Sequence, residues 1–246
     1  MLLEVKDLTK QYRGGQGIKG LNFTVAEGEV VALLGPNGAG KTTAMKAMMG
    51  LVPINSGTVL YKGISVIENP HLTKGEIGML VGDPAPYLHL TAVQYLRLYK
   101  KLYNGVTEED IDEVLGIIGL SDRRNSRIKT FSTGMKQRIC LGCILLIKPK
   151  LILLDEPFSG MDIEGRDQMV RLFKSIIEKY NTGLVISSHL IHDIENITSK
   201  VCIITNGTCR GTSTVSDILT SYSGIEKYYL DTVSKMSVRG REGEIA

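Results

Sequence analysis

The sequence predicts an α/β protein with a largely parallel sheet, an antiparallel sheet at one edge and an inserted helical subdomain. Apolar runs of strand length recur at residues 30–34, 77–81, 151–154 and 183–187, and charged or polar side chains follow the last two. Between the second and third runs, apolar residues follow helical spacings. A chain of 246 residues can bury one large core, so we expect a single main domain.

The composition is ordinary for a soluble protein, with 43% hydrophobic residues, 22% charged residues and a net charge of 29 − 26 = +3. So small a charge does not indicate a nucleic-acid partner. No stretch approaches the roughly 20 uninterrupted apolar residues that a membrane span needs. The first residues include Glu4 and show no signal-peptide pattern. We therefore expect a cytoplasmic protein that does not itself cross a bilayer.

A glycine-rich segment follows the run at 30–34 and fits the pattern G-x-x-x-x-G-K-[ST] at every fixed position. Its residues are Gly35, Pro36, Asn37, Gly38, Ala39, Gly40, Lys41, Thr42 and Thr43. The glycines let successive backbone N–H groups surround a phosphate. Lys41 would reach the outer phosphates, and Thr42, at the start of the next helix, could ligate Mg²⁺. The segment predicts a nucleoside triphosphate site, in preference to a turn that only ends a strand.

Two segments with alternating apolar residues, 2–8 and 21–25, predict short strands of the antiparallel edge sheet. The polar loop between them contains Tyr12. From its position alone, Tyr12 could stack on a purine base or pack against its own loop. Beyond the glycine-rich segment, residues 58–61 and 64–67 predict two more strands.

Helical patterns fill the expected insert, about residues 85–140. Thr91 caps a pattern whose apolar positions reach Tyr103, and Thr107 caps a second pattern with acidic residues in its first turn. A third helix is expected over residues 133–147.

The aliphatic run at 151–154 leads directly into Asp155 and Glu156. This pattern predicts a central parallel strand that delivers acids to its C-terminal end, where ligands bind in open α/β sheets. Adjacent buried acids have little structural purpose unless a cation neutralises them. Asp155 would hold Mg²⁺, and Glu156 would polarise an attacking water. The strand at 183–188 ends in a polar cluster with His189, which points to the same edge.

Cys140 and Cys143 form a C-x-x-C, a spacing found in metal and redox sites. They lie in an apolar helical run, and no second Cys/His pair has ligand spacing. Structural burial is therefore the favoured interpretation.

These elements together resemble the nucleotide-binding subunit of ATP-binding cassette (ABC) transporters, a P-loop NTPase family, over residues 1–212. The most discriminating segment is 131–138, which resembles the family's signature motif in the form S-x-G-M-K-Q-R. It offers the hydroxyl of Ser132 and backbone amides around Gly134 at a helix N-terminus. In the family, this surface binds the γ-phosphate of an ATP held by the opposite subunit. Since the chain has one P-loop and one signature motif, the resemblance implies that two copies close a site.

The resemblance also implies roles for residues already singled out. Tyr12 would stack on adenine, and His189 would contact the γ-phosphate. Asp155 would be the Mg²⁺-associated acid and Glu156 the catalytic base. Residues 159–162 resemble the loop that joins the sites of the two subunits.

One functional position departs from the family's pattern. Family members usually carry Gln after the strand corresponding to 77–81, where it contacts Mg²⁺ or water and senses the transporter domain. Here Gly82 stands in that place. Either Asp83 substitutes for the Gln or the contact is missing.

The implied organisation is an ABC ATPase domain over 1–212 and a C-terminal helical extension over 213–246 with a mobile end. Residues 84–91, the form of the signature motif and residues 225–230 are similar to the bacterial bacitracin- and lantibiotic-type export ATPases. The resemblance implies an ATPase whose two copies enclose two ATP·Mg²⁺ and drive a separate permease, with a preference for export. The chain would lie on the inner face of the cell membrane and reach it only through the permease.

Other P-loop proteins fit less well. A GTPase or small-molecule kinase would not explain the signature segment, and no N-K-x-D segment is present. A DNA-repair ABC ATPase would need a long coiled coil, but Asp155 follows Lys41 by only 155 − 41 = 114 positions, and this segment lacks sustained heptads. The remaining alternative is a soluble ABC ATPase with a regulatory role, a class that usually holds two cassettes in one chain.

Overall fold

The computed structural model describes residues 1–73, 75–82 and 85–242 and places the strands of this part of the chain in one sheet. The strands are β1 Leu3–Gln11, β2 Gly17–Val25, β3 Val30–Leu34, β4 Ser56–Tyr61, β5 Ile64–Ser65, β6 Ile77–Leu80, β7 Leu151–Asp155, β8 Gly183–Ser188, β9 Lys200–Thr205 and β10 Thr208–Thr214. The α-helices are α1 Lys41–Met48, α2 Ala92–Lys100, α3 Glu108–Ile117, α4 Thr133–Leu145, α5 Ile163–Tyr180, α6 Val215–Ser221 and α7 Ile225–Glu242.

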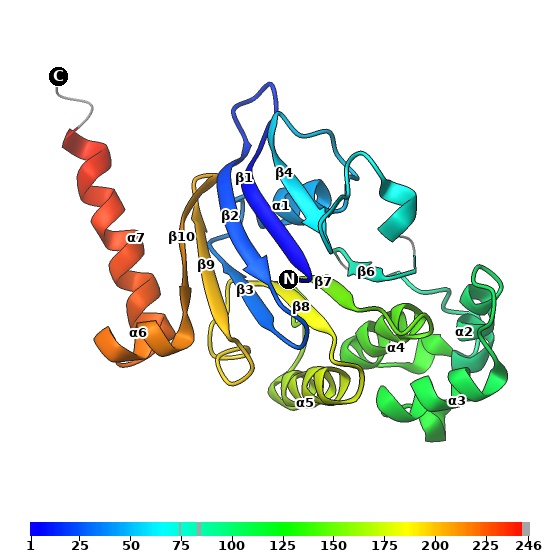
Figure 1. Cartoon of the computed structure of the whole chain (residues 1–246). Coiled ribbons are helices and arrows are strands. Elements are labelled where there is room, and N and C mark those ends of the chain that lie inside the picture. The colour runs from blue at the N-terminus through cyan, green and yellow to red at the C-terminus, as the bar shows by residue number, and fades with distance from the viewer. Residues whose placement is uncertain (74, 83–84, 243–246) are drawn as a thin grey trace.

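The strand order is β5-β4-β1-β2-β10-β9-β3-β8-β7-β6, which divides the sheet into two parts (Figure 1). Strands β9, β3, β8, β7 and β6 pair in parallel. Strands β2, β1, β4 and β5 pair antiparallel. β10 connects the two parts, because it pairs antiparallel with β9 and meets β2 at the pair Thr208–Lys19. The predicted parallel sheet with an antiparallel edge is confirmed.

The sheet has a hydrophobic core on each face, because successive side chains of a strand point to opposite sides. Val31 and Leu33 of β3 belong to the core that contains α1 and the antiparallel strands. Val30, Ala32 and Leu34 belong to the core that contains α2 to α5. The helix after the glycine-rich loop is therefore held between the parallel and antiparallel parts of the sheet.

The predicted helix starts at Thr91 and Thr107 are confirmed, and each is a complete capping box. The Thr91 hydroxyl accepts the N–H of Gln94 at 3.3 Å, and the Gln94 side chain accepts the N–H of Thr91 at 2.9 Å. Thr107 and Asp110 make the same reciprocal pair. Such pairs satisfy backbone donors that a helix start would otherwise leave free.

Several predicted boundaries are wrong by a few residues. α2 ends at Lys100 and does not reach Tyr103, because the N–H of Tyr103 turns back to the carbonyl of Lys100. β5 is a two-residue strand, since the N–H of Asn69 donates to the Ser65 carbonyl and closes a turn. α4 ends at Leu145, before Lys148 with its φ of +47°. β1 and β2 are each longer than predicted.

After β10 the chain forms α6 and α7, and α7 stands beside β10 on the side of the molecule opposite α2 and α3 (Figure 1). The Tyr228 hydroxyl lies 2.9 Å from that of Ser213, and the Tyr222 hydroxyl donates to Asp231 at 2.6 Å. The predicted C-terminal extension ends in α7, whose last residue is Glu242, and residues 243–246 of the predicted mobile end lie outside the described residues. Within the described part of the chain, none of the helices has both the length and the hydropathy needed to cross a membrane.

Candidate functional site

The glycine-rich loop runs from the end of β3 to the start of α1, and its backbone geometry requires glycine at two positions. Gly40 has a φ of +105°, in the left-handed region that glycine adopts readily. At Gly35, a Cβ would lie 2.2 Å from the carbonyl oxygen of Ile204 in β9. The helix begins at Lys41, one residue earlier than predicted. Two fixed positions of the sequence pattern therefore have a direct steric explanation.

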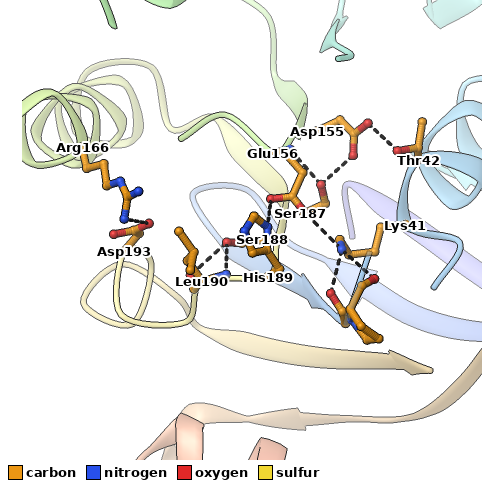
Figure 2. A network of polar contacts seen from close by, with 12 residues as sticks. Lys41, Thr42, Asp155, Glu156, Arg166, Ser187, Ser188, His189, Leu190 and Asp193 are labelled. Atoms are coloured by element: carbon orange, nitrogen blue, oxygen red, sulfur yellow. Dashed lines mark hydrogen bonds and ion pairs between the residues drawn. The ribbon is translucent and has the colours of Figure 1, made fainter. Parts of the chain in front are cut away.

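The ammonium group of Lys41 lies inside the loop, with 6% of the side chain exposed. It donates to the carbonyls of Gly35 at 2.7 Å and Pro36 at 3.2 Å. It also lies 3.0 Å from Oε1 of Glu156 (Figure 2). A buried charge needs such compensation. The structure thus brings the cation of the loop and one predicted acid into direct contact.

The Asp155 carboxylate lies at the C-terminal end of β7 and is buried. Its Oδ2 accepts a hydrogen bond from the Thr42 hydroxyl, and its Oδ1 accepts one from the Ser187 hydroxyl, both at 2.6 Å. Carboxylate and hydroxyl oxygens are ligands of the kind that Mg²⁺ prefers. Within the described residues, no group of three or more His, Cys, Asp or Glu side chains could hold a metal ion. The Asp155 and Thr42 oxygens are donors of the kind that suits Mg²⁺, which usually keeps waters or phosphate oxygens as its other ligands.

The Glu156 backbone is unusual, with a φ of +48° directly after β7. Its N–H donates to the Ser187 hydroxyl at 2.9 Å. Its Oε2 lies 2.8 Å from Nδ1 of His189, which follows β8 (Figure 2). The Glu156 carboxylate therefore lies between Lys41 and His189. This is the edge of the sheet at which the sequence predicts that the two acids and His189 meet.

Tyr12 lines the same pocket as the glycine-rich loop. This P-loop pocket has a volume of about 240 Å³. Its lining consists of Tyr12, Gln16, Gly17, Glu156 and residues 37–43. Tyr12 is 44% exposed, and the Lys10 ammonium lies over its ring, 4.8 Å from the ring centroid. An exposed aromatic residue beside a phosphate-binding loop is suited to stacking on a base.

The predicted signature residues form a separate pocket. Ser132 is the N-cap of α4, and its hydroxyl accepts the N–H of Met135 at 3.3 Å. Ser132 and Gly134 line a pocket of about 420 Å³ together with residues 160–162. This signature pocket shares no lining residue with the P-loop pocket. The structure therefore does not bring Ser132 and Gly134 to the P-loop of their own chain.

The position expected to carry Gln has a backbone that favours glycine. Gly82 has a φ of +66°, and an added Cβ would meet no atom within 4 Å. Of the two alternatives, the one in which Asp83 substitutes for the Gln concerns a residue outside the described part of the chain.

The expected burial of Cys140 and Cys143 is confirmed, since both are free thiols buried in α4. Burial raises the pKa of Cys140 to about 11 and that of Cys143 well above its ordinary value. Both thiols are therefore protonated at neutral pH, as is typical of structural cysteines.

Sequence reasoning missed the hydrogen bonds of Ser187 and the ion pair of Lys41 with Glu156. The one available signal for Ser187 was a pair of serines, Ser187 and Ser188, at the end of an otherwise aliphatic strand.

A family model, two curated relatives and a solved structure that match this chain all belong to the same family. The family model described as ABC transporter matches residues 18–159. The linearmycin resistance ATP-binding protein LnrL of Bacillus subtilis (strain 168) is 33% identical over 244 residues, which cover 97% of this chain and 76% of LnrL. The bacitracin transport ATP-binding protein BcrA of Bacillus licheniformis is 36% identical over 206 residues, which cover 84% of this chain and 67% of BcrA.

A solved structure of an ATP-binding subunit of an ABC transporter superposes with a TM-score of 0.81 at 29% identity, covering 95% of this chain and 100% of that one. The region matched by the family model, residues 18–159, includes the glycine-rich loop, the signature segment and the strand that carries Asp155. The chain therefore belongs to the ABC transporter family, as an ATP-binding subunit with the P-loop ABC ATPase fold.

Proposed function

We propose that two copies of this chain enclose two ATP molecules, hydrolyse them and thereby drive a separate permease that exports its cargo. The observation that supports a dimer is that the P-loop pocket and the signature pocket of one chain share no lining residue. A phosphate-binding loop and a helix N-terminus such as that at Ser132 both suit an anion. A second copy would place its own signature pocket over the P-loop pocket of the first.

The residues of the P-loop pocket have complementary roles in the proposed hydrolysis. Backbone amides of the loop and the Lys41 ammonium would hold the γ-phosphate and stabilise its developing charge. Glu156 would orient a water and accept its proton as the water oxygen bonds to the γ-phosphorus and the bond to the ADP oxygen breaks. His189, 2.8 Å from Glu156, would hold that carboxylate and contact the γ-phosphate. Tyr12 would stack on the adenine, which the exposed face of its ring allows.

Thr42 and Asp155 are the residues that would hold Mg²⁺, because their oxygens lie together beside the loop. When bound, the ion would neutralise charge on the phosphates. In this chain, the Thr42 hydroxyl at the start of α1 donates to Asp155, which supports the proposal that the two residues act together as ligands.

The names of two relatives support export, since one is a resistance protein for linearmycin and the other a transport protein for bacitracin. We infer a cytoplasmic protein at the inner face of the membrane, held there by its permease. The ATPase domain would comprise residues 1–212, with the helical insert over about 85–140, and residues 213–246 would form an extension. Because Gly82 has no side chain, the signal from the permease would reach the site without the usual Gln.

Replacing Glu156 by Gln tests the dimer and the base together. We expect the hydrolysis rate to fall by about 10²–10⁴-fold, the usual contribution of a general base. ATP binding should be intact, because Lys41 keeps its two carbonyl partners and loses a carboxylate that competes with phosphate. The bound but unhydrolysed ATP should hold two copies together, which light scattering after gel filtration with ATP and Mg²⁺ would detect.

Glu178→Gln is the matched control, since it removes an equal charge from an exposed position of α5. It should hydrolyse ATP at the wild-type rate and show no trapped dimer. Undiminished turnover in Glu156→Gln would refute the role of Glu156. A monomer with ATP bound, in a variant that no longer hydrolyses it, would refute the ATP-enclosing dimer.

A further inference from the structure

Ser187 occupies a position in β8 that connects the two acidic residues of the site. Its side chain is 0% exposed, and β8 pairs with β7 so that Ser187 lies opposite Asp155. The hydroxyl donates to Oδ1 of Asp155 at 2.6 Å and accepts the backbone N–H of Glu156 at 2.9 Å (Figure 2). One buried side chain thus makes hydrogen bonds to Asp155 and to Glu156, the two acids that the sequence predicts to act in the site.

The hydrogen bond to Glu156 supports a strained backbone. A residue other than glycine with φ in the left-handed region persists only where its surroundings hold it there. At Glu156 the φ of +48° turns the chain out of the direction of β7, and its N–H meets a side-chain oxygen of the neighbouring strand. Without the Ser187 hydroxyl, that N–H would lose its partner in a part-buried position, which is unfavourable.

The consequence of the turn is the placement of the Glu156 carboxylate. With this backbone, its two oxygens lie 3.0 Å from the Lys41 ammonium and 2.8 Å from the His189 ring. The second hydrogen bond of Ser187 leaves the other oxygen of Asp155 directed at Thr42. The neighbouring Ser188 does something different, because its hydroxyl bonds to the backbone of Leu190.

We propose that Ser187 is a positioning residue for ATP hydrolysis, which holds Glu156 in the turn that directs its carboxylate into the site and holds Asp155 toward Thr42. This inference rests on the role proposed above for Glu156. A serine is suited to the task because one hydroxyl supplies both a donor for the carboxylate and an acceptor for the N–H.

The test compares Ser187→Ala with Ser187→Thr and with a matched control, Thr182→Val. Thr182 precedes β8, is 0% exposed and donates its hydroxyl to the Pro149 carbonyl at 2.8 Å. Its substitution therefore removes one buried hydroxyl at the opposite end of the same strand. For each variant, kcat and KM for ATP, the affinity for a fluorescent ATP analogue and the thermal unfolding midpoint would be measured.

For Ser187→Ala we expect kcat to fall by about 10–100-fold, because a displacement of the order of 1 Å at a reacting group can lower the rate by up to about 100-fold. The affinity for the ATP analogue should stay within about 2-fold, since the contacts of Lys41 with the loop do not involve Ser187. Ser187→Thr keeps the hydroxyl on a residue that strands accommodate well and should recover most of the rate. Thr182→Val should lower stability without lowering kcat.

A double-mutant cycle with Glu156→Gln separates positioning from a general structural effect. If Ser187 acts through the Glu156 carboxylate, then Ser187→Ala should lower the residual single-turnover rate of Glu156→Gln by a smaller factor than it lowers the wild-type rate. The loss that remains in Glu156→Gln would measure the hydrogen bond of Ser187 to Asp155. This measurement remains decisive even if the added methyl of Ser187→Thr prevents that variant from folding.

Three results would overturn the inference: a wild-type kcat in Ser187→Ala, an equal fold-loss in both backgrounds, or a loss of nucleotide affinity as large as the loss of kcat. Each of these can occur while Glu156→Gln alone is inactive, so the role of Glu156 would survive. Full turnover in Glu156→Gln would instead refute the proposed base itself.

Discussion

The contact between the glycine-rich loop and β9 leads to a prediction for Gly35→Ala. The added Cβ would lie 2.2 Å from the carbonyl oxygen of Ile204, whereas real Cβ contacts with backbone are essentially never under 3.0 Å. The loop and β9 must therefore separate by at least 3.0 − 2.2 = 0.8 Å. The backbone fixes the position of the alanine Cβ, and the Ile204 oxygen is a main-chain atom, so no side-chain rotation can relieve the clash.

The displacement should reduce both stability and ATP binding. Overpacking of this kind costs about 1–3 kcal/mol, and each kcal/mol lowers the melting temperature of a chain of this size by about 2–4 °C. The same movement shifts the amides that would hold the phosphates. Losing one hydrogen bond to a charged group costs about 1.5–3 kcal/mol, which weakens the Kd for ATP by about 10–100-fold.

Thermal unfolding and an ATP titration by calorimetry would measure the two effects, with two alanine controls. Gly14 lies in an exposed loop, where an added Cβ would meet no atom within 4 Å. Gly14→Ala should therefore match the wild type in melting temperature and in affinity for ATP. At Gly38, an added Cβ also meets no neighbour, but its φ is +79°, so Gly38→Ala should show conformational strain without a clash. If Gly35→Ala melts and binds ATP like Gly14→Ala, the argument that β9 sets the position of the loop is refuted.

Two further predictions concern the partner and a cysteine pair. When the tagged chain is purified in mild detergent from membranes of its native cell, mass spectrometry should identify a multi-span protein in stoichiometric amount. Recovery of soluble partners or ribosomes alone would contradict the proposal that the chain drives a permease. The pKa of Cys209 is lowered to about 6, mainly by a hydrogen bond from the Cys202 thiol 3.4 Å away. Cys209 should therefore be thiolate above about pH 6 and react with iodoacetamide at neutral pH, while Cys140, whose pKa burial raises to about 11, stays unreacted as an internal control. Cys202→Ala should move the midpoint of the Cys209 pH–rate profile upward, and an unchanged midpoint would contradict the assigned cause.

Features that depend on neighbouring residues in the chain could be predicted from the sequence. The caps at Thr91 and Thr107 were predicted because their partners lie only three residues away, and the structure shows that each is a complete capping box. The glycine-rich loop was predicted from its sequence pattern. The φ of +105° at Gly40 is a local requirement, whereas the need for glycine at position 35 comes from Ile204 in β9. Boundaries were less accurate, as at Tyr103 and in β5, because the last turn of a helix or strand depends on tertiary contacts.

The sequence by itself determined the fold class, the phosphate-binding loop and the edge of the sheet at which Asp155, Glu156 and His189 would meet. The order of the strands was decided by the tertiary structure, including the position of β10 between β2 and β9. The tertiary structure also brought Ser187 to Asp155 and Lys41 to Glu156, pairs that are far apart in the chain. The physical reason is that an apolar strand can pair with many neighbours in several registers, and only the packing of both faces of the sheet selects one.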